Sequence, residues 1–235
     1  MQRLDKILSD AGAGTRSALR GMIRAGRVCV DGRPVCRPEE RFDEQNVSIT
    51  IDAEPVEKRR PVLLMLHKPA GYVTSTDDPG GPSVLELIPE RFRRFGVMPV
   101  GRLDKATEGL LLFTNDGVLA HRLISPRMCV WKTYYAEHEG ETDEADVRAF
   151  AEGLELGDGT RCLPARLTPL GAGKSCVQIR EGKYHQVRRM LAARGKPVTY
   201  LRRDAEGSLT LGDLEKGDVR ELPMAVLEEF FDNKM

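Results

Sequence analysis

A charged stretch with two prolines, residues 52–61, separates two parts of the chain that differ in their apolar patterning. Stretches of this composition are typical of linkers, because they offer few apolar side chains to bury. The chain has 235 residues, a length that suits one large or two modest domains. We therefore predict a small domain over residues 1–60 and a larger domain over residues 61–235.

The first sixty residues begin with helical spacing. Apolar residues from Leu4 onward predict a first helix, which Gly12 and Gly14 end. Thr15 predicts the N-cap of a second helix with one apolar face. Four arginines recur every three or four residues along an edge of that helix: Arg16, Arg20, Arg24 and Arg27. Cations aligned in this way are suited to following the phosphates of a nucleic acid.

Strand signals follow these helices. Residues 28–30 predict a strand, Asp31-Gly32 is a hairpin-turn signal, and residues 47–51 alternate in polarity. Together with Arg3-Leu4-Asp5-Lys6 and Thr15-Arg16, the segment Ile23–Gly32 resembles the S4-type RNA-binding domain, and the match covers most of residues 2–50. The resemblance implies a small α/β RNA-binding domain, while a generic small α/β unit is the plainer alternative.

Beyond residue 61, strand and helix signals alternate without the strict βα repeat of a doubly wound fold. The expected strands are residues 62–66, 109–114, 133–138, 162–170 and 175–179, and the expected helices are residues 118–124, 143–152 and 184–194. Strands with interspersed helices predict an α+β domain built on a mixed, mostly antiparallel sheet.

The net charge conceals an uneven distribution of charged residues. The total is zero, from 36 basic and 36 acidic residues. Residues 1–37 nevertheless hold eight Lys or Arg against three acids, residues 38–57 hold one against seven, and residues 180–203 hold eight against one. Because salt screens each patch over about 10 Å, a neutral total still permits basic faces that attract a polyanion. Ordinary solvated faces are the alternative for any single block.

Other features argue against several classes of protein. The five cysteines are odd in number and contain no C-x-x-C, so neither a disulfide framework nor a metal site is expected. The sequence lacks G-x-S-x-G, and the glycines at 79–82 lack the Lys and Ser/Thr of a P-loop. The longest apolar run, residues 62–66, is far shorter than a membrane span, and no signal-peptide pattern opens the sequence. We expect a cytoplasmic protein with no membrane partner.

Two segments of the larger part carry unusual combinations of charged residues. Gly101–Gly109 sets Asp104 between two cations on a turn ahead of an apolar strand. Glu181–Met190 begins a helix rich in cationic and polar groups. Asp104 alone would usually be a turn residue, and Arg188 alone would usually be a solvated helix cation. Their occurrence within specific neighbouring residues is what makes the two segments informative.

The segments G-R-L-D-x-x-T-x-G-L-L-L-x-T-N-D-G over residues 101–117 and E-G-K-Y-H-Q-V-R-R-M over residues 181–190 resemble the signatures of the RsuA-type pseudouridine synthases. Ser125-Pro126-Arg127 followed by Lys132-Thr133-Tyr134 is similar to the third segment of that family. The resemblance covers about residues 50–225. It implies a pseudouridine synthase catalytic domain behind the RNA-binding domain.

The resemblance implies that Asp104 attacks the target uridine, that Tyr134 lies against the uracil and helps to handle the proton leaving carbon 5, and that Arg188 pairs with Asp104. The isomerisation breaks the bond from ribose to base nitrogen, turns the base and rejoins it through carbon 5, so no cofactor is implied. A guanidinium would keep the carboxylate ionised where a bound base excludes water. Because strand alternation lets only one of Tyr134 and Tyr135 face the cleft, an ordinary core role for Tyr134 stays open.

Further residues are expected to bind the RNA. The resemblance places Arg102 at the mouth of the site. The signature segments and the front helix supply the other candidates, which are Lys132, Lys183, His185, Gln186, Arg189, Arg16, Arg20, Arg24 and Arg27. The target nucleotide must leave its stack to be modified, and phosphate contacts offset that cost.

The sequence departs from the family pattern in two places. His67 stands where Asn is usual, and residues 202–207 are more charged than the usual apolar and glycine-containing stretch. The second departure leaves the backbone path of this segment open.

The expected partner is ribosomal RNA, either free or in an assembling ribosomal particle, and we expect a monomer. The loop Ser75–Pro79 and the segment Ser125-Pro126-Arg127 favour small-subunit (16S) rRNA as the substrate. The alternatives are a large-subunit (23S) rRNA enzyme of the same family and a non-catalytic RNA-binding factor of ribosome assembly.

Overall fold

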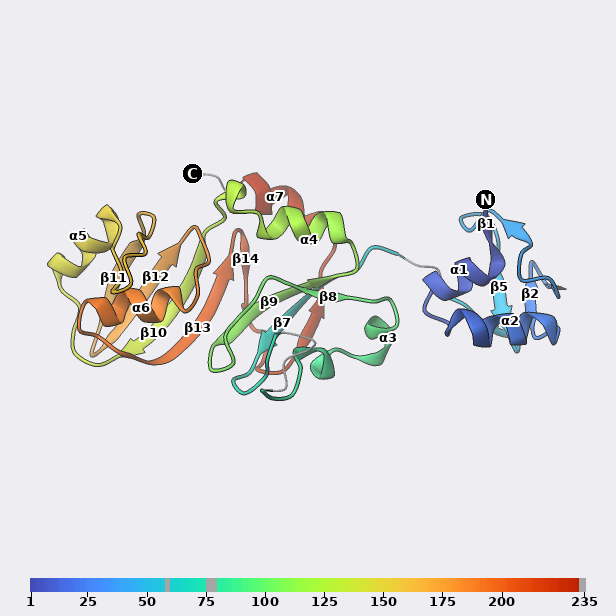
Figure 1. Cartoon of the computed structure of the whole chain (residues 1–235), viewed down its shortest axis with the longest axis horizontal. Helices are drawn as coiled ribbons and strands as arrows, with labels where there is room; N and C mark the ends of the chain where they lie inside the picture. Colours follow the sequence, from blue (N-terminus) through green and yellow to red (C-terminus); the bar gives the residue numbers. More distant parts are fainter. Residues whose placement is uncertain (58–59, 75–79, 233–235) are drawn as a thin grey trace. The chain divides into compact units, whose positions relative to one another are not determined.

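The computed structural model describes residues 1–57, 60–74 and 80–232, and its elements are labelled in Figure 1. The chain divides into two compact units. The first unit comprises Met1–Val62 and Pro89–Val97, and the second comprises Leu63–Ile88 and the chain from Met98 onward. The short helix α3 (Glu90–Arg93) therefore belongs to the first unit although the strands around it in the sequence belong to the second.

The first unit packs two helices on a small antiparallel sheet of order β3-β2-β5-β6. Its elements before α3 are β1 (Gln2–Arg3), α1 (Leu4–Asp10), α2 (Arg16–Arg24), β2 (Val28–Val30), β3 (Arg33–Pro34), β4 (Arg41–Phe42), β5 (Ile49–Ile51) and β6 (Glu54–Pro55). The Thr15 hydroxyl accepts the N–H of Ala18 at 3.3 Å, which confirms the expected N-cap. The strand β6 pairs with β5, so the predicted linker was wrong over its first residues.

The second unit is built on one mixed sheet of order β11-β12-β10-β13-β9-β7-β15, with β14 added to β13 and β8 added to β9. The strands are β7 (Leu63–Lys68), β8 (Met98–Val100), β9 (Glu108–Thr114), β10 (Lys132–His138), β11 (Arg166–Gly171), β12 (Lys174–Ile179), β13 (Val198–Glu206), β14 (Leu209–Thr210) and β15 (Val219–Glu221). Only β13 and β9 run parallel among these described pairs. The predicted α+β class with a mostly antiparallel sheet is confirmed.

Helices cover the two halves of this sheet separately. In chain order they are η1 (Val84–Leu87), α4 (Gly117–Ile124), η2 (Pro126–Met128), α5 (Glu144–Glu152), α6 (Gln186–Ala193) and α7 (Val226–Asp232). Figure 1 shows α4 and α7 by the half with β7 and β9, and α5 and α6 by the half with β10 to β13. Leu110 and Leu112 of β9 pack with Leu123 of α4 and Phe230 of α7 in one buried cluster.

The longest strand, β13, lies where the sequence left the backbone path open. Arg203 and Glu206 are buried within it, 3.3 Å apart, and the Arg203 Nε donates to the Leu110 carbonyl at 2.8 Å. The two opposite charges thus form an ion pair inside the sheet, although Arg203 Nη2 and Glu206 Oε2 make no hydrogen bond within the described ranges. At Gly109, the partner of Arg203, an added Cβ would lie 2.2 Å from the Arg203 carbonyl oxygen, so the close pairing of β9 and β13 requires glycine there.

Candidate active site

Asp104 lies on the turn between β8 and β9 and lines a cavity of about 300 Å³ in the second unit. Tyr134 of β10 and residues 182–187, which lead into α6, line the same cavity. The Asp104 side chain is 35% exposed, so the carboxylate faces the cavity without being sealed from solvent. The volume lies at the lower end of the range for small-molecule sites and suits a group of the size of a nucleobase.

A buried lysine holds the backbone of this turn. Lys68, at the end of β7, is fully buried. Its Nζ has three N–H donors and lies within hydrogen-bond distance of four carbonyl oxygens, those of Thr107 at 2.8 Å, Pro69 at 3.0 Å, and Asp104 and Lys105 at 3.2 Å each. Burial lowers the pKa of Lys68 to about 8, while the nearby Asp104 charge opposes that change. Lys68 carries no sequence signal for this role, because a lysine that ends an apolar strand usually reaches solvent.

His185 is the ionisable side chain that the structure places beside Asp104. Its Nε2 lies 3.5 Å from Asp104 Oδ1, and its ring stacks on Tyr184 with centroids 3.9 Å apart. The backbone of His185 is left-handed, with φ of 49°, which is uncommon for a residue with a side chain. Strained conformations of this kind persist only where surrounding structure holds them, and they gather at functional sites.

Asp104 and Arg188 are both described in the structure and form no ion pair with each other, so the predicted pairing was wrong. Arg188 instead donates to the carbonyl of Ala106 at 3.4 Å and to that of Val198 at 3.3 Å. These contacts direct its guanidinium to the backbone two residues beyond Asp104 and to the start of β13. Arg188 therefore connects α6 to the Asp104 turn through main-chain atoms.

Tyr134 and Tyr135 lie on opposite faces of β10. Tyr134 is buried and lines the cavity, and burial raises the pKa of its phenol. Tyr135 points to the other face, where its hydroxyl donates to Glu137 Oε1 at 2.8 Å and its ring meets Tyr200 edge-on. Of these two tyrosines, Tyr134 is thus the one that lines the cavity.

The expected RNA contacts of the second unit divide into two groups. Arg102, Lys183 and Gln186 line the cavity with His185. Lys132 does not: it lies 3.7 Å from Glu206, and burial lowers its pKa. Arg189 is also turned away, with Nη2 2.6 Å from Asp158 Oδ1. Lys132 and Arg189 thus each pair with an acidic residue of the second unit, and neither lines the cavity.

The four arginines of the first unit also differ from one another. Arg20 donates to the buried Asp5 at 2.8 Å, so it is part of the internal structure of this unit. Arg27 follows α2 instead of lying on it, and its Nε donates to Asp52 Oδ1 at 2.8 Å. Arg16 and Arg24 are exposed. The expected row of four available cations is therefore reduced to these two.

Three further features of the sequence concern a loop, metal binding and membrane spans. The loop Ser75–Pro79 lies outside the described residues. Within the described ranges, no cluster of three or more His, Cys, Asp or Glu is arranged to hold a metal ion. In the same ranges, every helix is too short or too polar to cross a membrane.

Comparisons with known proteins agree with this arrangement of two units. The family described as "RNA pseudouridylate synthase" matches residues 62–193, and the S4 domain matches residues 2–47. The chain is 38% identical to "Uncharacterized RNA pseudouridine synthase YtzG" of Bacillus subtilis (strain 168), over 94% of each chain. It is 37% identical to "Ribosomal small subunit pseudouridine synthase A" of Yersinia pestis, also over 94% of each chain.

Two further similarities extend the comparison. The chain is 35% identical to "Ribosomal large subunit pseudouridine synthase B" of Bacillus subtilis (strain 168), over 94% of this chain and 92% of that protein. A solved structure described as "Crystal structure of pseudouridylate synthase" covers 98% of this chain, with all of its own chain covered. Its TM-score is 0.68 and its sequence identity is 32%.

Proposed function

Because this chain belongs to the RNA pseudouridine synthase family, we propose that Asp104 is the nucleophile with which it converts a uridine of ribosomal RNA to pseudouridine. The observation that carries the proposal is the placement of Asp104 and Tyr134 in one cavity of nucleobase size. The domain boundary near residues 60–61 and the roles of the site residues are part of the same proposal.

The proposed reaction begins with a flipped-out uridine, because the reacting atoms are inaccessible in a base stack. Asp104 bonds to the ribose as the bond from ribose to base nitrogen breaks, and the freed uracil turns within the cavity. The base then bonds to the ribose through carbon 5 as the bond from ribose to Asp104 breaks. The base nitrogen gains a proton, and the proton on carbon 5 leaves. Tyr134 supports the ring, and it helps to handle that proton as a phenol that burial keeps neutral.

Other groups position the nucleophile and the substrate in this proposal. Lys68, which precedes the turn in the chain, binds the carbonyl of Asp104, and Arg188, which follows the turn, binds the carbonyl of Ala106. A loop anchored in this way keeps the carboxylate near one geometry, which lowers the entropic part of the barrier. His185 orients the Asp104 carboxylate, and the exposed Arg102 meets the RNA at the cavity mouth.

We propose small-subunit (16S) rRNA as the substrate, in free RNA or in an assembling particle, and a monomeric cytoplasmic enzyme. The sequence resemblance of residues 75–79 and 125–127 supports the choice of 16S rRNA. The similarity to a large-subunit enzyme makes 23S rRNA the alternative.

The substrate is tested by incubating the purified protein with small-subunit and large-subunit rRNA transcripts that carry tritium on carbon 5 of uridine. Tritium release from the 16S transcript alone is the expected result. Release from the 23S transcript alone would reassign the substrate. If neither the transcripts nor the assembling particles release tritium, the non-catalytic alternative is favoured. Mapping pseudouridines in cells with and without the protein then identifies the target position.

A further inference from the structure

A cluster of one tryptophan and two arginines lies in the second unit outside the candidate active site. Trp131 directly precedes β10, Arg166 begins β11 and Arg180 directly follows β12. The guanidinium carbons of Arg166 and Arg180 lie 4.5 and 4.8 Å from the centroid of the indole ring. We call these three residues the Trp131 cluster.

The strand register places this cluster on the sheet face opposite the cavity. Thr133 of β10 pairs with Gln178 of β12, which in turn pairs with Arg166 of β11. Paired residues in antiparallel strands point to the same face, and neighbours along a strand point to opposite faces. The buried residues Tyr134 and Ile179, which line the cavity, therefore point away from Arg166 and from Arg180.

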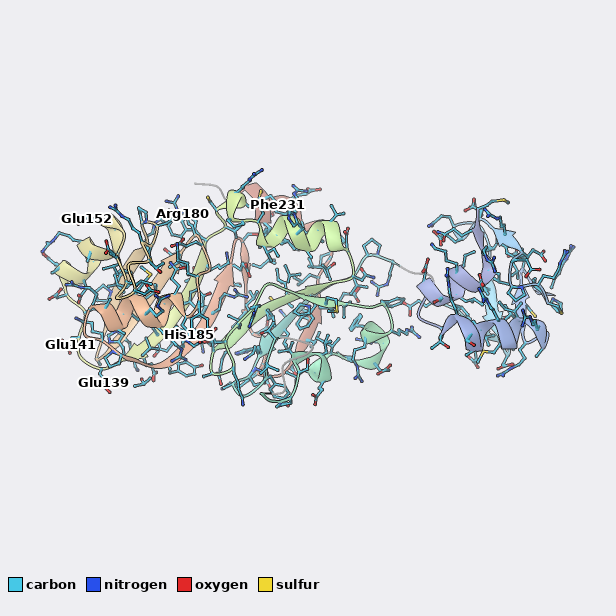
Figure 2. All side chains as sticks on the ribbon, in the orientation of Figure 1. Glu139, Glu141, Glu152, Arg180, His185 and Phe231 are labelled. Carbon is cyan, nitrogen blue, oxygen red and sulfur yellow. The ribbon has the colours of Figure 1, made fainter. Side chains whose placement is uncertain are left out.

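The same face is open. Burial alternates along β10 and β12, so that Thr133 and Gln178 are half-buried where Tyr134 and Ile179 are buried. Arg166 is exposed and Arg180 is half-buried. Figure 2 labels both Arg180, which directly follows β12, and His185, which directly precedes α6 and lines the cavity. Only a few residues of the chain therefore connect this face to the cavity wall.

Both cations of the cluster lack an acidic partner among residues 1–57, 60–74 and 80–232. The Nε of Arg180 is buried with no hydrogen-bond partner there, so the indole ring, not a carboxylate, holds this guanidinium. In contrast, Arg189, Arg194 and Arg202 each lie within 2.8 Å of an Asp oxygen. The cluster is thus a pair of positive charges whose attraction for an anion is not met within the described fold.

We propose that the Trp131 cluster binds the phosphodiester backbone of the RNA strand that flanks the target uridine. The inference rests on the proposed function, because the RNA must already enter the cavity. Two planar guanidinia present several donors suited to phosphate oxygens, and their position over an indole fixes their direction. The cluster lies where β12 ends and β11 begins. An RNA strand that leaves the cavity past Ile179 and passes around these strand ends meets Arg180 and then Arg166.

The cluster contains its own probe, because Trp131 is the only tryptophan of the chain. Its emission, excited at a wavelength that RNA does not absorb, is recorded as rRNA fragments are added to the full-length protein. We expect the emission to change and to saturate with the same midpoint as the anisotropy of labelled RNA. Saturated RNA binding with unchanged Trp131 emission would overturn the proposal.

A charge reversal supplies the second arm of the test. Arg166→Glu is expected to weaken binding about fivefold and to lower the slope of log affinity against log salt by about one. The matched control is Arg148→Glu, at an exposed arginine of α5 in the same unit. Equal effects of the two variants would contradict a local site.

Activity separates this inference from the proposed function. Arg166→Glu should release tritium at the wild-type rate once RNA saturates the enzyme, because the variant leaves the cavity untouched. A lower rate at saturation would contradict a pure binding role. If the wild-type protein releases no tritium from any rRNA, the proposed function fails, and the Trp131 titration still decides whether RNA binds here.

Discussion

Two basic segments that look alike in the sequence use their charges differently in the structure. Residues 1–37 and residues 180–203 each hold eight Lys or Arg. In the first segment Arg16 and Arg24 are exposed on α2, and no acidic partner of either is present in the described ranges. In the second segment Arg203 is buried in β13 beside Glu206. A count of charges therefore measures how many cations a segment has, not how many are available to RNA.

Each segment also uses two cations to hold one buried aspartate. Arg3 and Arg20 bind Asp5 in the first unit, and Arg194 and Lys196 bind Asp146 in the second. The two aspartate side chains are each 1% exposed. Because a buried carboxylate is stable only when it is paired, these cations stabilise the fold and are removed from the set that can contact phosphate.

The largest effect should come from Arg203→Met. The change removes the guanidinium that pairs with the buried Glu206 and donates to the Leu110 carbonyl, and it leaves Lys132, 3.7 Å away, as the remaining cation near Glu206. Breaking a buried ion pair costs about 3–5 kcal/mol, and the remaining lysine places the expected loss near the lower end of that range. Denaturant unfolding followed by Trp131 emission reports on the second unit, which contains this pair. The control in the first segment is Arg24→Met, whose effect is followed by hydrogen exchange of the first unit. It should change the unfolding free energy of that unit by less than about 0.5 kcal/mol. Equal small losses would show that the two segments do not differ in this way.

The next effect should come from Asp146→Asn and Asp5→Asn. Burial would raise the pKa of Asp146, but hydrogen bonds from Lys196 and Arg194 lower it to about 2. A bond from Arg3, with a further one from Arg20, lowers the pKa of Asp5 to about 2. Each ionised aspartate should stabilise its unit by about 2 kcal/mol at neutral pH.

The sign of the pH dependence follows from these lowered pKa values. The stabilisation is complete above the ordinary aspartate pKa near 3.8 and disappears as the pH falls toward 2. Hydrogen exchange of each unit against pH should therefore show a gap between wild type and variant that closes over this range. A gap that stays constant down to pH 2 would contradict the account.

Salt should affect the two aspartates unequally. The side chains of Arg3 and Arg20 are 41% and 45% exposed, whereas those of Arg194 and Lys196 are 34% and 14% exposed. Screening acts mainly on exposed charges, so added salt should reduce the effect of Asp5→Asn more than that of Asp146→Asn. The same hydrogen-exchange experiment at low and high salt checks this, and equal reductions would remove the distinction.

The smallest effect on stability and a clear effect on binding should come from the double variant Arg16→Ala and Arg24→Ala. Both side chains are exposed, so the fold should be unchanged within about 0.5 kcal/mol. RNA affinity should fall, and its salt slope should drop by about one to two. An unchanged slope would show that this edge of α2 does not meet RNA. Arg20→Ala is unsuitable here, because it also releases Asp5.

The helices and most strands were predictable because local signals determine them. Thr15 caps α2 as its position indicates, and the apolar run before Asn115 forms β9. The strand β13 escaped prediction because its Arg203 and Glu206 are buried by pairing with each other, which a periodicity of polarity does not reveal. Charged residues in a sequence indicate solvent only when no partner is brought to them by the fold.

The candidate site was predictable at its nucleophile and not at its supports. Asp104 and Tyr134 were indicated by the resemblance, and the structure brings both to one cavity. Lys68 and the true contacts of Arg188 depend on backbone carbonyls of the Asp104 turn, which carry no sequence signature. Side chains that bind main-chain atoms are found only when the path of the main chain is known.

The most direct test of the central claim is single-turnover tritium release from the target RNA by wild type and by Asp104→Asn, each at a concentration that saturates the RNA. Asn preserves the size of the side chain and removes the nucleophilic charge, so we predict that the rate falls by about four orders of magnitude or more while RNA affinity is retained. Release by the Asn variant at the wild-type rate would contradict the assignment of Asp104 as the nucleophile.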